Sequence, residues 1–118
     1  MNLRPLERKA IFEVKTYIEQ HFSKAMTLET LCALPWQNGQ VIFRRRRLHD
    51  AFSLTFLQTI REFHTKVRMQ KAKDLLETTD LSIKAIAISV GYKGNNNFST
   101  AFKLHFRVTP SEYRNGIT

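Results

Sequence analysis

Four consecutive arginines, Arg44 to Arg47, form the densest cluster of side chains in this sequence that could bind another molecule. A guanidinium presents its donors as a rigid fork, which fits the O6 and N7 acceptors of a guanine base and also the oxygens of a phosphate. At helical spacing Arg45 and Arg46 share one face with His49, and we predict that at least two of the arginines contact DNA. The alternative is a solvated run of charge that binds nothing.

A run of three asparagines near the C-terminus offers a second recognition chemistry. An asparagine amide pairs with both N6 and N7 of adenine, and recognition helices read bases with their first residues. The alternative is that these side chains only cap backbone amides at a helix start. We predict a base contact for Asn96 and phosphate contacts for Lys93, Lys103 and Arg107. The full set of predicted DNA-contacting residues is Arg44, Arg45, Arg46, His49, Lys93, Asn95, Asn96, Asn97, Ser99, Thr100, Lys103 and Arg107.

The overall charge is consistent with this chemistry. The 118 residues include nineteen Lys and Arg against ten Asp and Glu, for a formal net charge of +9 and a pI near 10.1. Such a balance is typical of proteins that meet nucleic acid or another anionic surface, although a merely soluble basic domain can share it. The 42% apolar content suffices for the core of one compact unit or two small ones. A length of 118 residues leaves no room for a second, regulatory or catalytic domain.

Other chemistries lack their residues in this sequence. Cys32 is the lone cysteine, which excludes an internal disulfide and a zinc ribbon, and the four histidines do not have metal-ligand spacing. No phosphate-binding glycine loop or Gly-x-Ser-x-Gly turn is present, so we expect neither an enzyme nor a cofactor. No apolar run reaches the ~18 residues of a membrane helix, and the N-terminus lacks the apolar region of a signal peptide. We therefore expect a cytoplasmic protein without a membrane partner.

Helical periodicity dominates the chain, with little strand-like alternation. Residues 5 to 22 predict a first, scaffolding helix. Thr27 is a good N-cap for a short helix that Pro35 would stop, because proline disfavours a helical conformation in the residue before it. Ser82 opens a matching short helix that ends at Gly91. In each half we expect a tight turn and a second, amphipathic helix to follow, which is the outline of a helix-turn-helix unit.

The two halves are related by an internal duplication. At an offset of about 54 positions, Phe102, Phe106, Val108 and Thr109 fall on Leu48, Phe52, Leu54 and Thr55. The short helices upstream match at an offset of about 55, which implies that one residue has been gained between the blocks. This alignment puts Arg44 at the apolar position of Phe98, and it pairs the capping box at Thr109 with Thr55 and Gln58. In the same alignment, Arg45, Arg46 and His49 correspond to Ser99, Thr100 and Lys103.

Residues from about 56 to 78 are predicted to form one uninterrupted helix with an apolar stripe near each end, so that one helix could serve two small cores. At 1.5 Å per residue it would be about 33 Å long, close to one turn of B-DNA. We therefore predict an all-α fold of two helix-turn-helix subdomains joined by a long linker helix. The expected boundaries are 1–55, 56–79 and 80–118 for the N-terminal subdomain, the linker helix and the C-terminal subdomain. A long helix in a plain bundle is the alternative.

The stretch "LSIKAIAISVGYKGNNNFSTAFKLHFRVTPSEYR" resembles the signature region of the AraC/XylS family of bacterial transcription regulators, and the resemblance extends over about residues 8 to 115. It implies two helix-turn-helix units joined by a long helix, which bind double-stranded promoter DNA by placing both recognition helices in successive major grooves. It also implies transcriptional activation, a contact with RNA polymerase, and action as a monomer on DNA at the nucleoid of a bacterial cytoplasm. Met1 favours a complete, one-domain member of the family.

The resemblance is weakest between residues 35 and 64, where the turn of the first unit departs from the family's usual form. The linker helix fits the family only if some four residues, about one helical turn, are added before it. An altered first unit leaves a second hypothesis, a module that docks on RNA polymerase or another regulator and binds DNA only weakly. Selection of binding sites from random DNA separates the two hypotheses.

Overall fold

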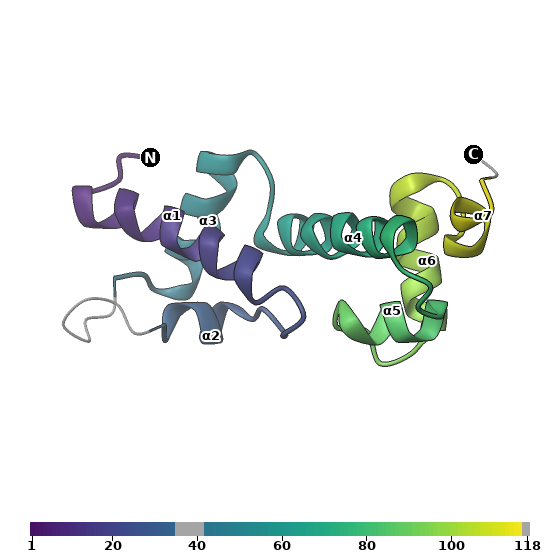
Figure 1. The fold of residues 1–118 in the computed structure, drawn as a ribbon. Coiled ribbons are helices and arrows are strands. Elements are labelled where there is room, and N and C mark those ends of the chain that lie inside the picture. The colour runs from purple at the N-terminus through teal and green to yellow at the C-terminus, as the bar shows by residue number, and fades with distance from the viewer. Residues whose placement is uncertain (35–41, 117–118) are drawn as a thin grey trace. The chain divides into compact units, whose positions relative to one another are not determined.

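The structure is a computed structural model, and it describes residues 1–34 and 42–116. These residues form seven α-helices and no β-strand, which confirms the predicted all-α fold (Figure 1). The helices are α1 (Pro5–Gln20), α2 (Leu28–Cys32), α3 (Arg45–Phe56), α4 (Ile60–Thr78), α5 (Ile83–Ser89), α6 (Asn95–Phe106) and α7 (Pro110–Arg114). The predicted stop of the second helix at Pro35 lies outside the described residues.

The chain divides into two compact units. Unit 1 comprises Met1–His21 and Ala25–His64, and unit 2 comprises Phe22–Lys24 and Thr65–Thr118. The helix α4 therefore begins in unit 1 and continues in unit 2. Its early residues Ile60 and Phe63 are buried, and Phe63 lies against Phe52 of α3, whereas its later apolar residues belong to the core of unit 2.

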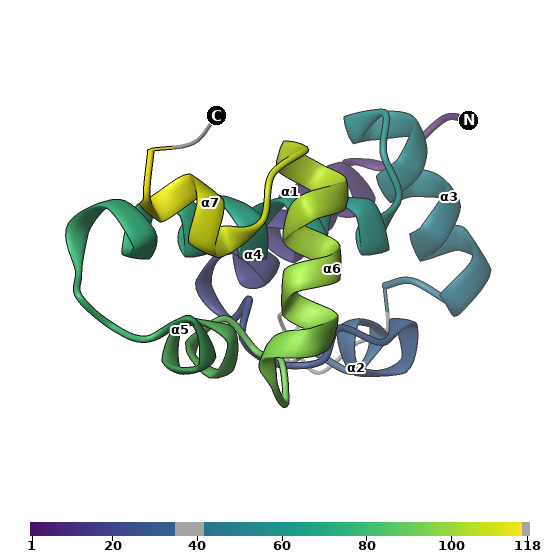
Figure 2. The same cartoon turned by 90° about the vertical axis from the view of Figure 1, so that its right-hand side faces the viewer.

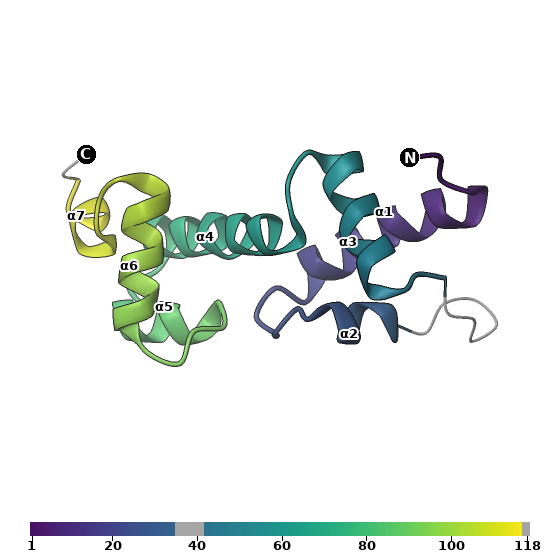
Figure 3. The ribbon, with the colours of Figure 1, turned by 180° about the vertical axis from the view of Figure 1, so that it is seen from behind.

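Unit 1 is built from α1, α2 and α3, and α3 packs against both of the other helices (Figure 3). The buried apolar residues of α1 recur at helical spacing and form one inward stripe, which comprises Ala10, Ile11, Val14 and Ile18. Leu48, Ala51 and Phe52 are the buried residues of α3. Because these side chains face inward, the opposite side of α3 is left to solvent.

Unit 2 packs α5 and α6 against the later part of α4 (Figure 2). Its buried core comprises Met69, Ala72, Leu76, Ile86, Ala87, Val90, Phe98 and Phe102, and Phe22 packs against it. The N-cap predicted at Ser82 is confirmed, since its hydroxyl accepts from the amide of Ala85 at 3.0 Å. The predicted capping box at Thr109 is also present, with Glu112 as its partner at 2.9 and 3.1 Å.

The duplication is real, but the predicted offset of 54 is wrong, because α3 and α6 match at an offset of 50. Both helices have 12 residues, and both end at a residue with positive φ, Leu57 at 59° and Arg107 at 69°. The capping box that corresponds to Thr109 lies at Thr59 and Glu62, at 2.8 and 3.0 Å, and not at Thr55 and Gln58.

The error has a simple physical origin. An apolar stripe repeats about every 3.6 residues, so a shift of four residues superposes the stripe on itself. Leu48, not Arg44, takes the position of Phe98, and Arg44 is the exposed N-cap of α3. In unit 1 the N-caps of α2 and α3, Thr27 and Arg44, are 17 positions apart. In unit 2 the N-caps of α5 and α6, Ser82 and Gly94, are 12 positions apart. Unit 1 therefore has five more residues between its two N-caps than unit 2 has.

Candidate nucleic-acid interface

The first turn of α6 presents three amide side chains to solvent. The N-cap of this helix is Gly94, whose extended backbone supplies no side-chain cap. Asn95, Asn96 and Asn97 follow it as exposed helical residues, and their side chains make no hydrogen bond within the described residues. These asparagine side chains therefore do not cap the backbone amides of α6, and they are available to an external partner.

The outward face of α6 continues from Asn96 to Thr100 and Lys103, which follow at helical spacing and are all exposed. The hydroxyl of Thr100 donates to the backbone carbonyl of Asn96 at 3.0 Å, while Ser99 is only half-exposed. Phe98 and Phe102 are completely buried on the opposite face and fix the rotation of the helix. Lys93 and Arg107 are exposed just before and just after α6, and α6 itself contains no acidic residue.

The turn that leads to α6 is held by Gly91 and Arg68. Gly91 has a φ of +106°, and an added Cβ would lie 2.6 Å from both the carbonyl oxygen of Ser23 and Nη2 of Arg68. Arg68 donates to the carbonyls of Phe22 at 2.7 Å and Lys24 at 3.2 Å, and burial lowers the pKa of its guanidinium. This packing leaves no room for a side chain at Gly91, which explains the glycine in the turn of this unit.

The corresponding face of α3 is more highly charged. At the offset of 50, Arg45, Arg46, His49 and Asp50 take the positions of Asn95, Asn96, Ser99 and Thr100, so the predicted pairing of the arginines with Ser99, Thr100 and Lys103 is wrong. The exposed fractions of the four side chains are 64%, 96%, 48% and 43%. The prediction that Arg45, Arg46 and His49 share an outward face agrees with their exposure, and Ser53 takes the place of Lys103.

Three of the four arginines have carboxylate partners, and two of these partners are distant in the sequence. Arg45 Nη1 lies 2.7 Å from Glu29 Oε1 of α2, and Arg46 Nε lies 4.0 Å from Asp50 Oδ2. Arg47 donates two hydrogen bonds to Glu7 of α1, from Nε to Oε2 at 2.5 Å and from Nη2 to Oε1 at 2.8 Å. Arg44 is exposed and has no such ion pair within the described residues.

The Glu7 and Arg47 pair belongs to the fold of unit 1. Glu7 is 5% exposed and also accepts from the backbone amide of Arg4 at 2.9 Å. The hydrogen bonds from Arg47 lower the pKa of Glu7 from its ordinary 4.5 to about 2. Glu7 lies three and four positions before Ala10 and Ile11, so a charged residue inside the buried stripe of α1 was the available signal that a cationic partner must exist.

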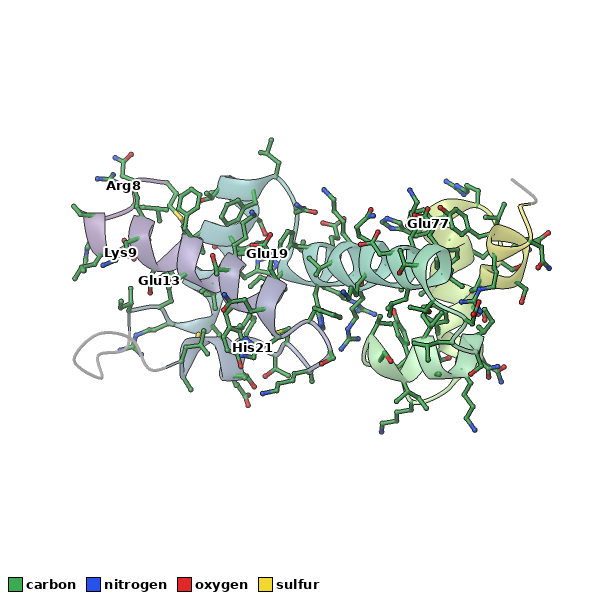
Figure 4. The ribbon with its side chains drawn as sticks, viewed as in Figure 1. Arg8, Lys9, Glu13, Glu19, His21 and Glu77 are labelled. Atoms are coloured by element: carbon green, nitrogen blue, oxygen red, sulfur yellow. The ribbon has the colours of Figure 1, made fainter. Side chains whose placement is uncertain are left out.

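Charges elsewhere on the surface are mixed in sign. Figure 4 labels Arg8, Lys9 and Glu13 on α1, and all three are exposed. Glu77 of α4, also labelled, accepts a hydrogen bond from the hydroxyl of Tyr113, which raises the pKa of that tyrosine to about 12. Among the described residues no group of His, Cys, Asp and Glu could hold a metal ion.

No helix in the same part of the chain is long and apolar enough to span a membrane.

Comparison with known proteins identifies related sequences and folds. Residues 41–116 match the family described as a helix-turn-helix domain. The chain is 31% identical over 102 residues to the raffinose operon transcriptional regulatory protein RafR of Pediococcus pentosaceus, a match that covers 86% of this chain and 35% of RafR. This chain thus spans about a third of the length of that relative.

Two solved structures share the fold. The C-terminal domain of AraT, a response regulator from Geobacillus stearothermophilus, has a TM-score of 0.82 and 32% identity, and the match covers 98% of this chain and 88% of that one. A probable AraC family transcriptional regulator from Rhodopseudomonas palustris has a TM-score of 0.74 and 28% identity, with 92% and 97% covered. A helix-turn-helix domain is a DNA-binding domain and not an enzyme. The chain therefore belongs to the AraC-type family of helix-turn-helix DNA-binding transcription regulators.

Proposed function

We propose that this chain regulates transcription by inserting α3 and α6 into successive major grooves of promoter DNA. The observation that supports this most is the equivalence of the two helices. Each follows a short capped helix, buries one apolar stripe and exposes the opposite face. Each outward face carries the donors that pair with base edges or phosphates, guanidinium groups on α3 and amides on α6.

The predicted DNA contacts divide by chemistry. Asn95, Asn96 and Asn97 lie in the first turn of α6, the part of a recognition helix that reaches base edges in helix-turn-helix proteins. The proposed phosphate ligands are Lys93, Lys103 and Arg107, which lie before or after that turn. Ser99 and Thr100 are proposed as further DNA contacts made by shorter side chains. On α3 the proposed contacts are Arg44, Arg45, Arg46 and His49.

The wider role is proposed on the family resemblance. We infer that the protein acts as a monomer on DNA at the bacterial nucleoid and activates transcription together with RNA polymerase. The alternative is a module that docks on the polymerase or another regulator with only weak DNA binding. Such a partner would cover exposed apolar side chains of α1, where Leu6 and Phe12 are 55% and 56% exposed.

Selection of binding sites from random duplex DNA, followed by mobility shift, tests the proposal. The regulator should enrich a site with two half-sites, each one major groove wide. Enrichment of no sequence, together with retention of RNA polymerase on the immobilised protein, would support the docking alternative instead. Both measurements use the full chain.

Asn96 gives a residue-level test on the enriched site. Replacement by alanine should weaken binding to that site by roughly 1 to 3 kcal/mol and relax the preference at one base pair, because adenine loses two hydrogen bonds. The melting temperature should stay the same, since the Asn96 side chain makes no hydrogen bond within the described residues.

Lys103→Ala is the matched control on the same face of α6. It should weaken binding to all sequences alike and make the slope of log affinity against log salt shallower by about one, as expected for one lost phosphate contact. Equal loss of binding by Asn96→Ala on specific and random DNA would contradict the base-reading role.

A further inference from the structure

Asp50 is the one acidic residue of α3, and it lies on the helix face that the proposed function turns toward DNA. The duplication assigns it to the position of Thr100, on the outward face of α6. Its side chain is 43% exposed, and the buried neighbours Ala51 and Phe52 fix the rotation of the helix at this point. A carboxylate here would approach polyanionic DNA, which is unfavourable unless it finds a donor.

The contacts of Asp50 keep its carboxylate on this face. Oδ1 lies 3.3 Å from Nδ1 of His49, and Oδ2 lies 4.0 Å from Nε of Arg46, one turn earlier. Neither contact buries the carboxylate, and the Arg46 side chain is 96% exposed. The Arg46 guanidinium reduces the repulsion between the Asp50 carboxylate and the phosphates, and the two contacts leave oxygen lone pairs free for a base.

Major-groove chemistry then limits which base can satisfy this group. An ionised carboxylate can only accept hydrogen bonds. Guanine presents two acceptors in the major groove, thymine presents an acceptor and a methyl group, and adenine places the N7 acceptor beside its N6 donor. Cytosine presents the N4 amino group, which is a donor. The carboxylate is thus attracted by cytosine and repelled by the acceptors of the other bases.

Resting on the proposed function, we propose that Asp50 is a specificity-determining residue of the first unit and selects cytosine by accepting a hydrogen bond from its N4 amino group. It acts in part by repulsion, because it penalises every site that places an acceptor opposite it. It therefore lowers affinity for DNA in general and raises discrimination at one base pair.

Site selection with the wild-type chain, Asp50→Ala and Asp50→Asn tests this. The wild type should require cytosine at one position of one half-site. Asp50→Ala should lose that preference, by roughly tenfold or more in relative affinity. Its binding to random duplex should become tighter, because a negative charge has been removed. Asp50→Asn should change the preferred base to adenine, whose N6 and N7 pair with an amide.

Glu29→Gln is the matched control, because Glu29 also pairs with an arginine of the run but lies on α2. It should tighten binding to DNA and leave the preference for cytosine at the Asp50 position unchanged. Unaltered base preferences in both Asp50 variants, with unchanged melting temperatures, would overturn the inference alone. A wild-type chain that enriches no sequence would overturn the proposed function as well, so the two failures are distinguishable.

Discussion

At the scale of single residues, neighbouring arginines of one run serve different purposes. Arg47 is held by a carboxylate buried in unit 1, whereas Arg46 is almost fully exposed. For most of the candidate interface, the sequence was enough to predict which side chains are exposed. The partners could not, because Glu7 and Glu29 lie 40 and 16 positions from the arginines that they bind. Only the folded positions of α1 and α2 bring these charges together.

The Glu7 and Arg47 pair makes the stability of unit 1 depend on pH. The pKa of Glu7 is about 2 in the folded chain and about 4.5 ordinarily, so the folded state favours the ionised form. The pair stabilises fully above pH ~4.5, and this contribution is lost as the pH falls from there toward 2. Urea unfolding of the wild type between pH 2 and 7 should show that loss.

Glu7→Gln should lower the free energy of unfolding by about 2 kcal/mol at pH 7 and remove most of the acid-dependent difference. Glu29→Gln is the control, since an exposed ion pair contributes little and should change stability by less than about 1 kcal/mol. Parallel pH profiles for wild type and Glu7→Gln would show that the buried pair does not cause the acid sensitivity.

At the scale of elements, caps were more predictable than register. The N-caps at Thr27, Ser82 and Thr109 each accept from the amide three residues on, as their residue types predict. The register of the duplication could not be fixed from apolar positions, because a one-turn shift preserves them. The ends of α3 and α6 do fix it, but the left-handed conformation at Leu57 has no signal in a leucine.

The end of α3 is therefore strained at a position where a glycine would fit. Leu57 has a φ of 59° and is 89% exposed. Leu57→Gly should relieve about 1 to 2 kcal/mol of left-handed strain, offset by about 0.5 to 1 kcal/mol of backbone entropy. We expect a net gain of up to about 1 kcal/mol in the free energy of unfolding, measured in urea.

Leu57→Ala separates the backbone effect from the loss of the side chain, since alanine retains the strain. It should be no more stable than the wild type. A Leu57→Gly chain less stable than Leu57→Ala would show that the leucine side chain, and not its backbone, governs stability at this helix end.

At the scale of the whole molecule, two units with separate cores are joined by one continuous helix. Phe52 and Phe102 are equivalent under the duplication, and both are completely buried. Each lies among aromatic rings of its own unit, Phe52 with Phe56 and Phe63, and Phe102 with Phe98, Phe106 and Tyr113. These two residues therefore allow the cores to be perturbed one at a time.

We predict that the two cores open independently. Replacing a buried phenylalanine by alanine costs about 3 to 5 kcal/mol, and that loss should fall on the unit that contains it. In hydrogen exchange, Phe52→Ala should speed exchange at amides of α1 and α3 while α5 and α6 keep their protection, and Phe102→Ala should do the reverse. The first turn of α4 should follow unit 1, and the remainder of α4 should follow unit 2, because its buried residues divide between the cores. Equal loss of protection in both units from either substitution would mean that α4 couples them into one cooperative fold.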